Sequence, residues 1–167
     1  MDARFLADFR QTVDRATDRL LAVSNEEAAA RPAPGKWSRK EIIGHLIDSA
    51  SNNHGRFVRA QLQDDMIFAG YDQDAWVRVQ RYQDRPWADL VGLWQRFNHQ
   101  IAAVMETADL DALARPRARH NLDQLAWQPV SATQSTTLEF FMRDYVDHLK
   151  HHLRQACPER DADPSTS

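Results

Sequence analysis

The chain has 167 residues, with 21 Lys and Arg against 24 Asp and Glu, and a formal net charge of −3. This length favours one domain with a sizeable core, and the charge argues against a nucleic-acid partner, which would need a basic face. No apolar run approaches the roughly 18–20 residues that cross a bilayer, and the single cysteine, Cys157, excludes a disulfide framework or a multi-cysteine zinc site.

Two long helices are predicted in the first half of the chain. Apolar residues recur at helical spacing from about Asp2 to Val23. The segment 31–36 (RPAPGK) ends this pattern, because its prolines and glycine interrupt a helix. The second helix runs from Ser38 to about Gln63, and Ser38 with Glu41 forms a capping box. The N-terminus lacks the apolar core of a secretory signal, so we expect a cytoplasmic protein.

Helices also dominate the second half. A short helix is predicted near Asp74, and a third long helix begins near Pro86, a residue favoured in a first turn. A polar connection follows over about 109–135. The fourth long helix starts with a second capping box, Thr136 to Glu139, and ends near Ala156.

These elements predict an all-α protein, because β periodicity is almost absent. Four amphipathic helices of this length are typical of a four-helix bundle, with long connections after the second and third long helices. We expect a single domain over residues 1–156. The polar segment 157–167 is predicted to be a flexible tail.

The fourth helix carries a histidine pair at i, i+4 spacing. On a helical wheel His148 and His152 share one edge of the apolar stripe, whereas His151 faces outward. Such a pair can chelate a divalent ion, and a solvated histidine run is the alternative interpretation. Leu149 follows His148, so the H-E-x-x-H pattern of one class of metalloprotease is excluded.

The second helix offers a third ligand, His45, on one border of its own apolar stripe. Four polar side chains share that side of the helix: Glu41, Ser49, Asn52 and Arg56. If the two edges meet, His45 converges with the histidine pair; a hydrogen-bonded histidine at the core edge is the alternative. The other histidines have no partner at ligand spacing and are interpreted as structural or surface residues: His54, His99 and His120.

Three neutral imidazoles suit Zn²⁺, Ni²⁺ or another late first-row divalent ion. Three protein ligands leave one position open, which is typical of a catalytic site. An ion there lowers the pKa of a bound water or thiol. A divalent metal, with Zn²⁺ or Ni²⁺ favoured, is therefore the predicted cofactor.

Two stretches carry a family resemblance. GKWSRKEIIGHLIDSASNNHGRF (35–57) has one histidine after a W-S-x-x-E helix start, and TLEFFMRDYVDHLKHHLRQ (137–155) contains D-H-x-x-H-H. Together with the segment 71–94, they resemble the DinB/YfiT-like family over roughly residues 1–156.

The resemblance implies a four-helix bundle that holds a divalent metal on His45, His148 and His152. It also implies thiol-dependent chemistry, because family members include S-transferases that use bacillithiol and an isomerase that uses mycothiol. Dimers are frequent in the family, so a homodimer is an expectation here.

The first functional hypothesis is a thiol-dependent S-transferase. A low-molecular-weight thiol acts as a thiolate on an electrophilic small molecule. Arg56 is a candidate to bind a carboxylate of thiol or substrate, and Asn52 to orient it. Glu41 and Asp144 each lie one turn before a histidine, so each is a candidate partner of a ligand or a general base. Ordinary helix-surface ion pairs are the alternative for these side chains.

Two other functions remain open. A metal-dependent hydrolase at the same site needs a general base that the sequence does not single out. A metal-binding or stress-associated dimer without turnover would be marked by a fourth protein ligand. Trp127 is interpreted as a packing residue, with cover over the site as the alternative, and Cys157 has no dyad partner that would make it a nucleophile.

Overall fold

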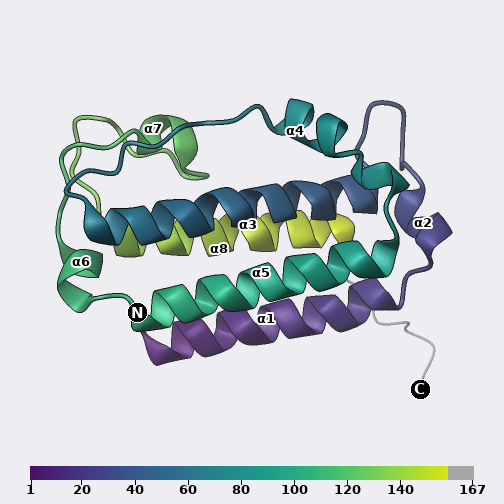
Figure 1. Cartoon of the computed structure of the whole chain (residues 1–167), viewed down its shortest axis with the longest axis horizontal. Helices are drawn as coiled ribbons and strands as arrows, with labels where there is room; N and C mark the ends of the chain where they lie inside the picture. Colours follow the sequence, from purple (N-terminus) through teal and green to yellow (C-terminus); the bar gives the residue numbers. More distant parts are fainter. Residues whose placement is uncertain (158–167) are drawn as a thin grey trace, which may run out of the picture.

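The structure is a computed structural model, which describes residues 1–157 and confirms the all-α four-helix bundle (Figure 1). The long helices are α1 (Ala3–Leu21), α3 (Arg39–Leu62), α5 (Trp87–Thr107) and α8 (Leu138–Ala156). Between them lie α2 (Asn25–Ala29), α4 (Gln73–Gln80), the 3-10 helix η1 (Tyr82–Asp84), α6 (Leu110–Ala114) and α7 (Leu122–Leu125). Residues 1–157 contain two isolated β-bridges and no strand. Apart from its first residue, the expected flexible tail lies outside the described residues.

Two pairs of long helices run parallel. In Figure 1, α1 and α8 run in one direction and α3 and α5 in the other. The 24 residues of α3 span about 36 Å. Because α5 runs parallel to α3, the chain must return over this length before α5 begins. The long connection after α3 makes this return and carries α4 across the outer side of α3. A second long connection, with α6 and α7, precedes α8.

Most helix boundaries agree with the sequence pattern. The capping box at the start of α3 forms as predicted, because the Ser38 side chain accepts from the Glu41 backbone N–H and the Glu41 carboxylate accepts from the Ser38 N–H. The second predicted box is wrong. Thr136 pairs through its backbone with Arg117, which keeps it extended, so Thr137 caps α8 instead. Glu139 pairs with Arg143.

The short helices α2, α6 and α7 were not predicted, because segments of four or five residues carry no readable helical period. The helix expected near Asp74 is α4, and Asp72 caps it. In the segment that ends the first helical pattern, Gly35 has φ 75°, a left-handed conformation that glycine adopts without strain.

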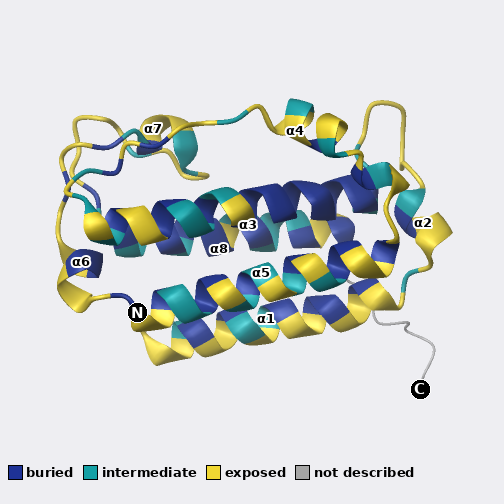
Figure 2. Cartoon of the chain, in the orientation of Figure 1, coloured by how far each residue is buried: buried dark blue, intermediate teal, exposed yellow. Residues whose placement is uncertain are grey.

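The core lies between the four long helices, whose facing sides are buried in Figure 2. The first half of α3 is buried on every side: each residue from 40 to 50 is buried. The outer side of this stretch is covered by α4 and η1, which pack on α3. Polar side chains there, including His45, therefore sit inside the protein rather than at a solvated edge. Within the described residues no helix has the length and apolarity to cross a membrane.

Candidate metal centre

Three histidines converge between α3 and α8. His45 lies in the buried half of α3, and His148 and His152 lie one turn apart on α8, as the helical wheels predicted. One ring nitrogen from each histidine lies within 4.8 Å of the other two. Among residues 1–157, no fourth His, Cys, Asp or Glu joins this group.

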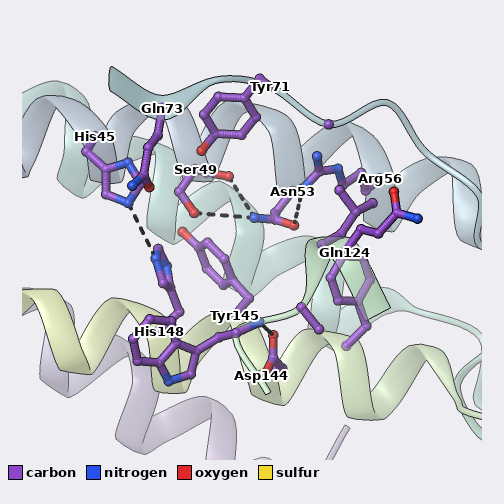
Figure 3. A pocket seen from close by; sticks show the side chains of 15 residues that line it. His45, Ser49, Asn53, Arg56, Tyr71, Gln73, Gln124, Asp144, Tyr145 and His148 are labelled. Atoms are coloured by element: carbon purple, nitrogen blue, oxygen red, sulfur yellow. Dashed lines mark hydrogen bonds between the residues drawn. The ribbon is translucent and has the colours of Figure 1, made fainter. Parts of the chain in front are cut away.

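The spacing of two of these nitrogens fits a tetrahedral ion. Two nitrogens at about 2.0–2.1 Å from an ion, at the tetrahedral angle, lie about 3.3–3.4 Å apart. The Nε2 atoms of His45 and His148 face each other at 3.4 Å (Figure 3). The Nδ1 atom of His45 is buried without a hydrogen-bond partner among the described residues. This side chain is therefore held by packing, including Trp37 at 5.2 Å between ring centroids.

The electrostatics keep the imidazoles neutral, as metal binding requires. Burial lowers the pKa of His45 to about 4, with a smaller contribution from His152. Burial also lowers the pKa of His148 to about 3, helped by the three neighbouring histidines. The pKa of His152 is lowered by burial as well. At neutral pH all three rings have a free lone pair.

Gln155 orients the third ligand. Its side-chain oxygen lies 2.9 Å from Nδ1 of His152, and oxygen accepts only, so this nitrogen carries the proton. The tautomer leaves Nε2 of His152 free as a ligand, which is the arrangement that partners of metal-binding histidines enforce. The amide nitrogen of Gln155 contacts His151 at 3.1 Å. His151 is half-buried because Trp127 packs on it at 4.6 Å.

A cavity of about 260 Å³ runs from His45 and His148 along α3 and α8 (Figure 3). This is close to the lower end of small-molecule sites, about 300–1,000 Å³. The segment 124–127 and the residues before α4 line its outer side, and Trp127 lies 5.5 Å from His148 between ring centroids. Covering the site was the alternative role for Trp127, and its position agrees with that role. The polar lining includes Ser49, Asn53, Arg56, Tyr71, Gln73, Gln124 and Asp144.

Of the two predicted substrate-binding residues, one lines the cavity and the other does not. Arg56 lines the cavity, with Nη1 donating to Asn53 Oδ1 at 3.3 Å and Nη2 donating to the Ala69 carbonyl at 2.7 Å. Asn52 does not line the cavity; its amide donates to the Asp48 carbonyl one turn earlier on its own helix. Asn53, one position along, takes the place expected for Asn52.

The two candidate acids are both engaged elsewhere. Glu41 closes the capping box, pairs with Arg31 and does not line the cavity. Asp144 does line it, but its two carboxylate oxygens accept the backbone N–H groups of Trp127 at 2.8 Å and Gln128 at 2.7 Å. Burial raises the pKa of Asp144, and these two hydrogen bonds oppose the rise. Its contacts make it the anchor of the segment that covers the histidines.

Asp144→Ala is expected to lower the free energy of unfolding by about 1–3 kcal/mol, because two backbone donors lose their acceptor. Asp147→Ala is the matched control, since Asp147 is exposed on the same helix, and its effect should stay within about 0.5 kcal/mol. Denaturant unfolding of the metal-free proteins measures both. Equal stability of the two variants would contradict the anchoring role.

Sequence reasoning missed several residues in and near this site. Tyr71 sits in a connection, where no helical wheel applies, and burial raises its pKa to about 12. Asp48 lies under α4, where it accepts from Gln80 and, at 2.6 Å, from the Tyr82 hydroxyl. Gln155 is at i+3 from His152, a spacing that signals helix neighbours. Only this last contact had a signal in the sequence.

Comparisons with known proteins agree with this architecture. The DinB superfamily matches residues 8–156. YfiT of Bacillus subtilis (strain 168), a candidate metal-dependent hydrolase, is 22% identical over 147 residues, which cover 88% of this chain and 73% of YfiT. The solved structure of YfiT, described as an unusual four-helix bundle, superposes with a TM-score of 0.70 at 18% identity and covers 95% of this chain and 87% of its own.

A mycothiol-dependent maleylpyruvate isomerase has the same fold. Its crystal structure gives a TM-score of 0.65 at 11% identity, over 92% of this chain and 60% of the isomerase. At these identities the superpositions show the fold. The superfamily match extends over nearly the whole described chain, and the chain therefore belongs to the DinB superfamily.

Proposed function

We propose that this protein is a metalloenzyme that holds a divalent cation, Zn²⁺ or Ni²⁺, on His45, His148 and His152 and transfers a small-molecule thiol to an electrophile. The observation that supports the proposal most is the position of three neutral imidazoles at one end of a substrate-sized cavity. The absence of a fourth His, Cys, Asp or Glu ligand among the described residues favours a substrate position over a closed structural site.

Each residue of the site has its own role in this proposal. The bound ion supplies a thiolate at neutral pH. Gln155 holds His152 in the tautomer that binds, and Trp127 limits access of water to the histidines. Arg56 and Asn53 bind the polar end of the ligand. Glu41 caps α3 and Asp144 anchors the covering segment, so neither serves as the base in this proposal.

Metal-dependent hydrolysis is the second candidate, favoured by the activity assigned to YfiT. It uses the same three histidines but needs no thiol. We also propose a cytoplasmic location, as expected from the sequence, and a homodimer, as the family resemblance implies.

One pair of assays separates the two candidates. Metal-loaded protein is mixed with cysteine and 1-chloro-2,4-dinitrobenzene, from which the thiolate displaces chloride, or with 4-nitrophenyl acetate and no thiol. We expect thioether formation at least about tenfold above that of the His148→Ala/His152→Ala variant, because metal activation contributes several kcal/mol. Ester cleavage without thiol, lost in the same variant, would favour hydrolysis. Wild-type rates equal to those of the variant in both assays would contradict both candidates.

A further inference from the structure

One cation in the cavity has no opposite charge beside it. Arg56 is only 5% exposed, and its two hydrogen-bond acceptors, Asn53 and the Ala69 carbonyl, are both neutral. Among residues 1–157, no carboxylate forms an ion pair with it. A buried charge without a counter-ion is costly, so a guanidinium held this way is ready to receive an anion.

The surroundings select the kind of anion. Asn53, Gln73 and Gln124 bring neutral amides to the cavity, and Asp144 brings a negative charge. Arg59, one turn beyond Arg56, is exposed and does not line the cavity. One guanidinium neutralises one negative charge and matches the two oxygens of a carboxylate. Arg56 is the one Lys or Arg among the lining residues and Asp144 lines the same cavity, so a singly charged carboxylate fits better than a phosphate dianion.

The helix sets the distance between this cation and the histidines. Arg56 follows His45 by eleven residues on α3, so their α-carbons lie about 16 Å apart along the axis. The Arg56 side chain leans back to Asn53, which follows His45 by eight residues, so the guanidinium lies about 12 Å along the axis from the His45 α-carbon. A sulfur–metal bond of about 2.3 Å and an ion pair of about 2.8 Å take up part of that length.

We propose that the cavity binds an elongated thiol carboxylate, with its carboxylate on Arg56 and its sulfur at the three histidines. This inference rests on the proposed metal site and adds the substrate class: a chain of about five or six carbons, or its equivalent in amide bonds, between sulfur and carboxylate. Asn53 and the amides of the lining accept or donate hydrogen bonds along the chain.

Cobalt-loaded protein tests the proposal by its absorption spectrum, because thiolate bound to Co²⁺ adds a charge-transfer band. The probes are 3-mercaptopropionate, 6-mercaptohexanoate, 11-mercaptoundecanoate and the neutral 6-mercaptohexanol. We expect 6-mercaptohexanoate to bind about tenfold or more tightly than 6-mercaptohexanol, as for a charge-assisted contact. The three-carbon acid is too short to reach Arg56 and the eleven-carbon acid must fold, so both should bind more weakly than 6-mercaptohexanoate.

Arg56→Gln should abolish the preference for acid over alcohol, and Arg59→Gln should retain it. Equal affinities of the six-carbon acid and alcohol for the wild type would overturn the proposal, and this comparison needs no variant. A preference that survives Arg56→Gln would overturn it too. In those cases the cobalt and thiolate bands still appear, and the metal site stands. Failure of Co²⁺ to give a bound spectrum would instead refute the metal site on which the inference rests.

Discussion

Untagged protein is expected to hold close to one equivalent of divalent metal, and the His148→Ala/His152→Ala variant to hold none. Two of the three convergent ligands disappear in this variant, leaving His45 alone on α3. Loss of a partner that merely orients a ligand costs about 10–100-fold in metal affinity, so loss of two ligands should cost well over 100-fold. Elemental analysis after dialysis measures the metal, and a polyhistidine tag must be absent because it binds the same ions.

The chain offers a matched control. His54→Ala/His99→Ala removes one histidine from α3 and one from α5, and both lie outside the convergent group. This variant should keep its metal, since neither ring supplies a ligand. Failure of the wild type to bind Zn²⁺ or Ni²⁺ after incubation would refute the metalloenzyme proposal. The His45–His148 contact would then be a hydrogen bond inside a helical binding protein.

Local pattern was enough to find the three histidines. The wheel places His148 and His152 on one edge of α8, and the capping box fixes where α3 begins, hence where His45 points. Whether the two edges meet depends on how α3 and α8 pack, which no single helix encodes. The family resemblance predicted that the two edges meet, and the structure brings them together.

The same wheels misplaced the neighbour of Arg56. An apolar stripe marks the core side of a helix only when its other side is solvated. In α3 the first half is covered all round, because the long connection returns over it as α4 and η1. Asp48, in this covered half, therefore meets α4. Beyond that half, Asn53 lines the cavity and Asn52 does not. Tyr71 and Trp127 reach the site from connections, where the sequence has no periodic signal.

Gly44→Ala is expected to lower the free energy of unfolding by about 2–4 kcal/mol, although alanine normally stabilises a helix by up to about 1 kcal/mol over glycine. A β-carbon at this position would overlap Cδ2 and Cγ of the Tyr82 ring. Tyr82 is only 2% exposed, so the ring has little room to move. Displacing it would also break the 2.6 Å hydrogen bond from its hydroxyl to the buried Asp48 carboxylate.

Gly55 provides the control on the same helix, because a β-carbon there meets only the end of a flexible arginine at 4.0 Å. Gly55→Ala should therefore stabilise the protein by about 0.5–1 kcal/mol, and denaturant unfolding compares the two variants. In a Tyr82→Ala background, Gly44→Ala should cost nothing, since the ring that it meets is gone. If Gly44→Ala still lowers the free energy of unfolding in that background, the new β-carbon clashes within α3 itself and not with the Tyr82 ring. If instead the ring is responsible, close contact between Gly44 and Tyr82 is what holds η1 and the end of α4 against the turn that carries His45.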